Sequence, residues 1–474
     1  NNVIAAPFTA EWVEQGNYEA QATSLSDVLY STYLGILSYD GGRLAIGPTG
    51  KAYVGGMTHP YFGDEQSGFC NVANDLPCNQ GFVARLSANG QNLEQLLIFG
   101  GSNDDYVEDI VVNQAGEIFV TGTTASTNFP TTAGAVSTTH GSGTFDGFVS
   151  KINATGGTFA YSTYLPGTTE EASYGLAVDP AGMAYAAGWF TNGAHRDAVV
   201  IKLNSTGTAT VYGSALGGSG RDEANDIAVN PNGEVFVTGY TESTNFPVTS
   251  GVVGSSKGTG GNDGFVVRLQ ANADYSYATY LPGNTAEIGR GIAIDSNNNA
   301  YITGVYDSSG QDNALALKLN PTGTTTVYGT GFGGSAADEG YEIAVDEFGQ
   351  AYITGFTNST NFQVTADAIQ NSKPAHSAET QDSFVTKFDL NGQLIYGSYF
   401  GGNELDYGTG IGVGDNAAVY MTGFTNSASI AEGGGFPVTN NSYRSIYVPG
   451  CQDPFVARLA IGPGQLYIPL ITTP

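Results

Sequence analysis

The segment that decides the fold is "EVFVTGYTESTNFPVT" at 234–249, because the chain repeats it. Close copies are "EIFVTGTTASTNFPTT" at 117–132 and "AYITGFTNSTNFQVT" at 351–365. The glycine of the "VTG" element recurs at intervals of 51 to 68 residues, as Gly56, Gly122, Gly188, Gly239, Gly304, Gly355 and Gly423. A repeat of this period is typical of folds in which each unit buries its faces against its neighbours.

Each copy contains four strand-like runs in constant order. An apolar run that ends in a turn, such as "IAVNPNGE" from Ile227, precedes the "VTG" strand. A run such as "DGFVVRL" and then a tyrosine-rich run such as "YSTYLPG" at 161–167 follow it. Short aromatic and β-branched runs separated by NG or TG turns predict antiparallel strands. We therefore expect an all-β, seven-bladed β-propeller with four-stranded blades, since a closed ring covers both faces of every sheet.

The two ends of the repeat region predict how the ring closes. "LYSTYLG" at 29–35 matches the fourth strand of the unit, whereas the last copy ends after "DPFVARL" at 453–459, where its own fourth strand is due. The N-terminal strand is therefore expected to complete the last blade. This reading divides the chain into an N-terminal arm at 1–27, the propeller at 28–460 and a C-terminal tail with a short apolar strand at 461–474.

The order of the motifs resembles that of a known family. In the sixth copy it runs from "IAVDEFGQ" through "AYITGFTNSTNF" and "DSFVTKF" to "IYGSYFGG", and it is similar to the bacterial seven-bladed β-propeller repeats known as SBBP. The third and fifth copies depart from the pattern because they lack the "STNFP" segment. The resemblance implies a propeller and a secreted or cell-surface setting, and it brings no catalytic residues to carry over.

Composition limits the partners. The chain has 15 basic and 44 acidic side chains, a net charge of −29, so the field of the protein opposes binding to nucleic acid or to an anionic membrane. No run approaches the roughly 18 apolar residues of a membrane span, and we expect no membrane insertion. Only 12% of the residues are charged, which leaves a surface rich in Thr, Ser, Asn and Gly. We expect an extracellular or cell-surface protein in its mature, secreted form.

The three cysteines suggest an oxidising compartment. Cys70 and Cys78 lie close together in the sequence, and we expect them to form a disulfide. A bridge from Cys451 to one of these two is the competing arrangement, and an unpaired buried thiol is the third.

A repeated acid follows each "GG" or "PG" pair by four residues, in the loop that leads from one blade to the next. Six copies carry it, as Asp105, Glu171, Asp222, Glu287, Asp338 and Asp406, and the first copy has Tyr39 with Asp40 beside it. As a functional site these acids would form a ring near the mouth of the channel that binds a cation, with calcium the candidate, or a polyhydroxylated ligand. The structural alternative is that each carboxylate accepts backbone N–H groups of its own turn and holds adjacent blades together. No cofactor is required in either case.

The third strand of every unit carries one basic residue. These are Arg85, Lys151, Lys202, Arg268, Lys318, Lys387 and Arg458. Buried cations need partners, so ion pairs between blades are the structural expectation and a basic ligand site is the alternative.

The C-terminal tail contains a compact apolar run formed by Leu466, Tyr467, Ile468, Leu470 and Ile471. Such a run associates unless it is covered. It either folds back on its own propeller or docks on a neighbouring molecule as an added strand, which would link propellers into a fibre or array.

Catalytic motifs are missing from the sequence. The four histidines lie in four different copies, and no nucleophile elbow, phosphate loop or zinc spacing is present. The length variation falls in the loops between the second and third strands, which makes the face that carries them the candidate binding surface. We expect a non-enzymatic structural or adhesive propeller whose partners are itself or other surface proteins. The alternative is a propeller that binds or cleaves carbohydrate on this acidic loop face.

Overall fold

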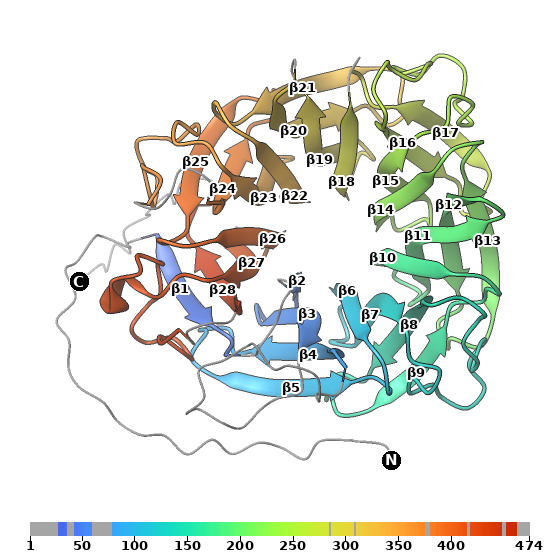
Figure 1. Ribbon diagram of the computed structural model, residues 1–474, viewed down its shortest axis with the longest axis horizontal. Helices are drawn as coiled ribbons and strands as arrows, with labels where there is room; N and C mark the ends of the chain where they lie inside the picture. The colour runs from blue at the N-terminus through green and yellow to red at the C-terminus, as the bar shows by residue number, and fades with distance from the viewer. Residues whose placement is uncertain are drawn as a thin grey trace, which may run out of the picture.

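Seven four-stranded antiparallel sheets stand around a central axis (Figure 1). The computed structural model describes residues 27–35, 42–58, 78–283, 286–307, 310–374, 380–414, 418–447 and 452–461. The described sheets confirm the predicted seven-bladed, all-β propeller.

Blades 1 to 6 each use four consecutive strands. Blade 1 contains β2 (Arg43–Ile46), β3 (Ala52–Thr58), β4 (Gln80–Leu86) and β5 (Leu93–Phe99), and blade 2 contains β6 (Asp105–Val112), β7 (Ile118–Thr124), β8 (Asp146–Ile152) and β9 (Phe159–Tyr164). Blade 3 contains β10 (Glu171–Val178), β11 (Ala184–Asn192), β12 (His195–Leu203) and β13 (Thr210–Leu216), and blade 4 contains β14 (Asp222–Val229), β15 (Val235–Thr241), β16 (Asp263–Leu269) and β17 (Tyr275–Tyr280). Blade 5 contains β18 (Glu287–Ile294), β19 (Ala300–Asp307), β20 (Asp312–Leu319) and β21 (Thr326–Phe332), and blade 6 contains β22 (Asp338–Val345), β23 (Ala351–Thr357), β24 (Asp382–Phe388) and β25 (Leu394–Phe400). We refer to the strands of each blade as A to D from the axis outward.

Blade 7 closes the ring with strands from both ends of the chain. It contains β26 (Asp406–Val413), β27 (Val419–Thr425), β28 (Asp453–Leu459) and, as its outermost strand, β1 (Val28–Tyr33). β1 pairs antiparallel with β28, and Tyr33 lies opposite Phe455. The predicted closure by the N-terminal strand is confirmed.

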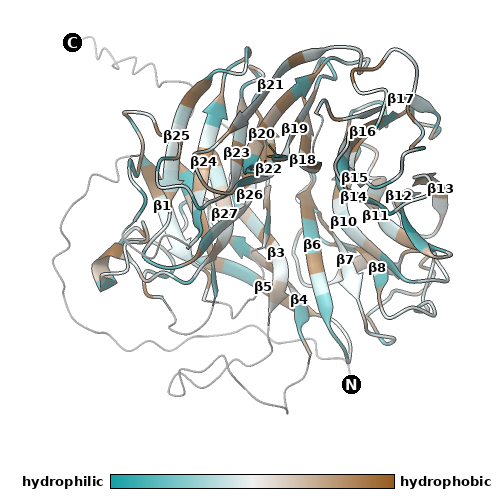
Figure 2. Ribbon diagram, turned by 45° about the horizontal axis from the view of Figure 1, so that its top comes forward, coloured by the Kyte–Doolittle hydropathy of each residue, from teal (hydrophilic) through white to brown (hydrophobic). Residues whose placement is uncertain are grey.

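The core is divided among the blade interfaces. The described residues form seven buried apolar clusters, one at each interface between neighbouring blades. The middle strands B and C are buried on both faces, as β7 and β24 show, because each faces a neighbouring blade on either side. Strand D lies at the rim and alternates more between buried and exposed residues, so Val211 and Val327 are exposed. Hydrophobic and hydrophilic segments follow one another along the strands (Figure 2). The cluster between blades 7 and 1 joins Tyr420 to Val54 and closes the ring.

The recurring "VTG" glycine lies opposite a β-bulge. In six blades strand A shifts register by one residue, leaving its fourth residue unpaired. The bulge turns the carbonyl of the second residue of strand A against the glycine of strand B. A Cβ at these six glycines would lie 1.8 to 2.0 Å from that oxygen, so no side chain fits. The shorter strand β2 of blade 1 shows no register shift, and a Cβ at Gly56 would lie 3.0 Å from the nearest atom, on the Phe82 ring.

The "STNF" segment fastens the B–C loop to its own blade. In blade 4 the buried Phe246 ring stacks 4.8 Å from Phe265, and the Tyr280 hydroxyl donates to the Ser243 carbonyl at 2.8 Å. The Asn245 side-chain oxygen accepts the Ser219 N–H at 2.9 Å. Blades 2 and 6 repeat these contacts with slightly more tilted rings. Blade 7 keeps the tyrosine bond, and its Phe436 ring meets Phe455 edge to face at 4.9 Å. The segment that first defined the repeat therefore has a structural role.

The basic residue of each strand C lies over an aromatic ring of strand B in the same blade. The seven pairs, at 4.5 to 6.0 Å, are Arg85–Tyr53, Lys151–Phe119, Lys202–Tyr185, Arg268–Phe236, Lys318–Tyr301, Lys387–Tyr352 and Arg458–Tyr420. The predicted ion pairs between blades were wrong for these residues. Where a strand C cation forms an ion pair among the described residues, the acid belongs to the same blade, as in Lys151–Glu117 at 2.9 Å. The contact with the next blade is a hydrogen bond to a turn carbonyl, such as Arg85 to Ala154 at 3.2 Å.

Several predictions fall outside the described residues. Cys70, Cys451 and the apolar run 466–471 lie there, so the disulfide and the self-association of the tail stay predictions. The Cys78 Sγ lies 3.2 Å from the Ser102 carbonyl oxygen. The described helix η2 (Ile430–Glu432) has three residues, and no helix in the described ranges is long and apolar enough to cross a membrane.

Candidate functional site on the propeller axis

The six predicted ligand residues lie apart, one in each of blades 2 to 7, and each is the first residue of strand A instead of a loop residue. All six are buried. In the four aspartate copies the second glycine of the preceding turn donates its N–H to the carboxylate at 2.6 to 2.8 Å. These are the contacts of the structural alternative. Within the described ranges no three metal-ligating side chains gather at one point, and a calcium ring stays a prediction.

The identity of the acid follows the length of the B–C loop. Asp105, Asp222, Asp338 and Asp406 each accept a hydrogen bond at 2.8 to 3.0 Å from the serine of the "STNF" segment or, in blade 7, from Ser427. Blades 3 and 5 lack this segment, and there the acid is glutamate, Glu171 or Glu287. A Cβ at Gly167 would lie 1.8 Å from a Glu171 oxygen, so the longer side chain folds back over its own turn. This covariation is visible in the sequence but becomes interpretable only with the contacts.

Burial of these acids makes stability depend on pH. Desolvation raises the pKa of Glu171 to about 8, above its usual 4.5, and the nearby Asp146 adds to the shift. A raised pKa in the folded state gives stability that is complete below the usual pKa and is lost as pH rises through about 8. Burial raises the pKa of Asp406 to about 8 as well, so the effect has the same sign in blade 7.

We expect Glu171→Gln to stabilise the protein near pH 8.5 by about 1–2 kcal/mol and to change little near pH 4.5. Glutamine resembles the protonated acid, so the variant removes the cost of ionisation at high pH alone. Denaturant unfolding at the two pH values measures this. Glu170→Gln, at the partly exposed neighbour, is the matched control and should change neither value. An equal effect of Glu171→Gln at both pH values would show that packing, not ionisation, is responsible.

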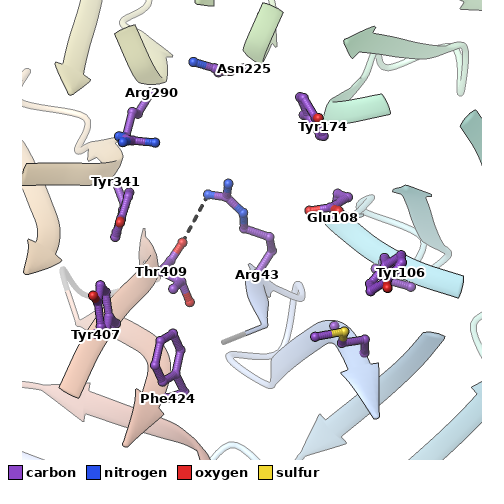
Figure 3. Close-up of a pocket in the computed structure, with 13 residues that line it drawn as sticks. Arg43, Tyr106, Glu108, Tyr174, Asn225, Arg290, Tyr341, Tyr407, Thr409 and Phe424 are labelled. Carbon is purple, nitrogen blue, oxygen red and sulfur yellow. Dashed lines mark hydrogen bonds between the residues drawn. The ribbon is translucent and has the colours of Figure 1, made fainter. Parts of the chain in front are cut away.

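The residues that line the axis come from the bulges. Each bulge leaves the fourth residue of strand A unpaired, and these residues are Glu108, Tyr174, Asn225, Arg290, Tyr341 and Thr409. All six line a cavity of about 350 Å³ (Figure 3). The other lining residues come from the start of strands A and the end of strands B, so the cavity lies toward the face that carries the B–C and D–A loops. That is the face predicted for binding.

One wall of the cavity is aromatic. The Tyr407 ring stacks on Phe424 at 4.7 Å and on Tyr341 at 6.1 Å, with interplanar angles of 21° and 25°. Tyr106 and Tyr174 lie across the cavity from this stack (Figure 3). The Tyr174 hydroxyl accepts the Trp189 indole N–H at 2.9 Å, which fixes that tyrosine. The cavity thus presents aromatic surface from two sides.

Arg43 reaches from β2 into the middle of the cavity (Figure 3). Its guanidinium donates to Glu342 at 2.9 Å and to the Thr409 carbonyl at 3.2 Å, so it passes blade 7 to reach blade 6. Three further acids, Asp109, Asp226 and Glu108, interact with it electrostatically. The first two also bond to a neighbouring blade: Asp109 accepts the Leu176 N–H and Asp226 accepts the Ile292 N–H, each at 2.7 Å. Burial raises the pKa of Glu342, and Arg43 opposes the rise. Arg43 is therefore a paired cation in the middle of the cavity.

None of the side chains that line this cavity was predicted from the sequence as a site residue. The predicted site residues were those that recur in the repeat, whereas the bulge position carries a different residue in nearly every blade. The feature that could have indicated the cavity is this variability at one fixed position before the "IAV" run. In a closed ring, one fixed position of strand A points to the axis from every blade.

The fold and the cavity define a seven-bladed β-propeller with an axial pocket. The chain matches the model of the family "SBBP: Beta-propeller repeat" over residues 215–247, 277–305 and 327–363. Each match runs from strand D of one blade through strands A and B of the next. These three matches confirm the SBBP-type repeat that the motifs predicted.

Comparison with other proteins adds no function. No curated protein matches the sequence. Among solved structures, hydrazine synthase of Kuenenia stuttgartiensis is 9% identical, with 82% of this chain and 93% of that chain covered and a TM-score of 0.48. The Pan2 WD40 domain of Neurospora crassa is 9% identical, with 93% and 98% covered and a TM-score of 0.47. Sqt1 of Chaetomium thermophilum, bound to the N-terminus of ribosomal protein L10, is 13% identical, with 83% and 97% covered and a TM-score of 0.43. Similarities at this level carry no argument about what this chain binds.

Proposed function

We propose that this chain is a non-enzymatic recognition propeller, a structural or adhesive module of the cell exterior that holds a ligand on its axis. The observation that carries the proposal is that recurring residues and variable residues have different places in the structure. Those that recur in the repeat are engaged in packing: the "VTG" glycine against the bulge, the phenylalanine of "STNF" against strand C, and the basic residue of strand C over an aromatic ring. Those that differ from blade to blade line the cavity.

Two features favour binding over catalysis in this cavity. Glu108 is the one carboxylate among the described lining residues, whereas most glycoside hydrolases act with a pair. The arginines Arg43 and Arg290 are paired with Glu342 and Glu339. Self-assembly through 466–471 belongs to the same proposal and depends on residues outside the described ranges.

We expect a ligand of the cavity to raise the melting temperature of the wild-type chain, because binding to the folded state alone stabilises it. The probes are neutral oligosaccharides, oligogalacturonates, and short peptides of acidic, basic and neutral composition. The stabilisation should be absent in Tyr407→Ala, which removes the middle ring of the stack. Tyr306→Ala, at a partly buried tyrosine outside the cavity, should respond like wild type. If no probe class distinguishes Tyr407→Ala from wild type, the chain is not a recognition module of this kind.

A further inference from the structure

We infer that the axial cavity binds a neutral saccharide. This inference rests on the proposed function and specifies the ligand class of the same site. The cavity volume of about 350 Å³ lies at the small end of ligand pockets, which span roughly 300–1,000 Å³. It is a size for a small ligand or for the end of a longer chain.

The aromatic wall suits the apolar face of a sugar ring. A pyranose presents C–H groups on its faces and hydroxyl groups around its edge. The rings of Tyr341, Tyr407 and Phe424 lie nearly parallel in one stack on one side of the cavity, and C–H groups are attracted to such aromatic surface. Tyr106 and Tyr174 lie on the opposite side (Figure 3). A sugar ring in the cavity would therefore contact aromatic side chains on both sides.

The polar groups of the cavity are mixed donors and acceptors, as hydroxyl groups require. Arg43 and Arg290 carry five N–H donors each, and Glu108 and Asn225 carry acceptor oxygens. The Asn225 side-chain amide donates a hydrogen bond to the Gly289 carbonyl at 2.7 Å, and this bond fixes the orientation of the side chain. A sugar hydroxyl both donates and accepts, so it can be satisfied by either kind of group.

The charges of the cavity select against ionic ligands. Arg43 lies 2.9 Å from Glu342, and Arg290 lies 2.7 Å from Glu339 and covers the Tyr341 ring at 4.9 Å. Neither cation is left to balance an anion, and the net charge of −29 repels one. The carboxylates of Glu342 and Glu339 are in turn engaged by these two arginines, so they are not left to bind a cationic ligand. A neutral polyhydroxylated ligand is the class that remains.

Trp189 offers a direct readout of the site. Its indole N–H donates to the Tyr174 hydroxyl, and it is one of two tryptophans in the chain. A ligand that contacts Tyr174 should change the tryptophan emission, and this signal should vanish in Trp189→Phe while calorimetry still detects binding. Loss of the heat of binding in Tyr407→Ala, with the heat retained in Trp189→Phe, then locates the ligand.

The experiment titrates the full chain with cellotetraose, maltotetraose, mannotetraose, chitotetraose and tetragalacturonate by calorimetry. We expect at least one neutral tetrasaccharide to bind, Tyr407→Ala to weaken it roughly tenfold or more, and Tyr407→Phe to keep it within roughly threefold. Tyr306→Ala should leave the affinity unchanged, and thermal unfolding of each variant reports its folding.

Three results would overturn the inference: no neutral tetrasaccharide binds at millimolar concentration, tetragalacturonate binds more tightly than the neutral sugars, or Tyr407→Ala and Tyr407→Phe both bind like wild type. If a short peptide stabilises wild type but not Tyr407→Ala while every saccharide fails, the ligand class is wrong and the recognition function stands.

Discussion

Gly239→Ala should lower the free energy of unfolding by about 3 kcal/mol, the upper end of the usual cost of overpacking. The added Cβ would lie 1.9 Å from the Glu223 carbonyl oxygen and 2.9 Å from the Ala224 Cα. Both are backbone atoms of the bulged strand β14, so neither can rotate away as a side chain would. Relief of the clash requires the bulge to move, and the bulge sets the position of the axial residue Asn225.

Gly213→Ala is the matched control, because a Cβ at this exposed strand position meets nothing within 4 Å. Both substitutions reduce the freedom of the unfolded chain by the same amount, so their difference isolates the clash. Gly56→Ala should be intermediate, since blade 1 has no register shift at this point and the nearest atom, on the Phe82 ring, lies at 3.0 Å. Chemical denaturation of the three variants measures the series. Equal effects at Gly239 and Gly213 would show that the bulge yields and that the recurring glycine has another cause.

The sequence predicted the ring because every blade obeys the same constraints. Strand alternation, turn residues and the unpaired ends of the repeat are local or periodic features, and β1 and β28 pair as their motifs predicted. The bulge has no local or periodic pattern in the sequence, because it depends on how strand A pairs with strand B. The recurring glycine was therefore seen but not explained until Gly239 and the Glu223 carbonyl were placed together.

The cavity and the ionic contacts were harder to predict for a different reason. For each basic residue of strand C the sequence predicted an ion pair with an adjacent blade. Arg268 instead lies over the Phe236 ring, which is opposite it on the neighbouring strand, and pairs with Glu234. Its contact with the next blade is a hydrogen bond to the Pro321 carbonyl. The axial residues differ between blades, so they carry no repeat signal. Only closure of the ring brings Tyr341 and Tyr174 to one cavity.

Tyr33→Ala should destabilise the propeller by about 3–5 kcal/mol, the range for removal of a fully buried aromatic side chain. Tyr33 is 0% exposed, and its ring lies 5.7 Å from Phe436 and 5.8 Å from Tyr447. Its hydroxyl donates to the Ser427 carbonyl at 2.9 Å, and that bond fastens the long loop of blade 7. Tyr33→Phe removes only the hydrogen bond and should cost about 1 kcal/mol.

The position of Tyr33 makes this the test of ring closure. β1 is held in blade 7 by its pairing with β28 and by its side chains, whereas the chain that follows it continues into blade 1. Tyr33 of β1 packs in the interface between blades 6 and 7, and Tyr30 packs in the interface between blades 7 and 1. Detachment of β1 would therefore open two of the seven interfaces. Leu29→Ala, at a residue of the same strand that is 50% exposed, is the control and should stay within about 0.5 kcal/mol of wild type. Denaturant unfolding and hydrogen exchange of β28 distinguish the two variants. We expect faster exchange of β28 in Tyr33→Ala alone. Equal behaviour of both variants would mean that the packing of Tyr33 from β1 is not needed to close the ring.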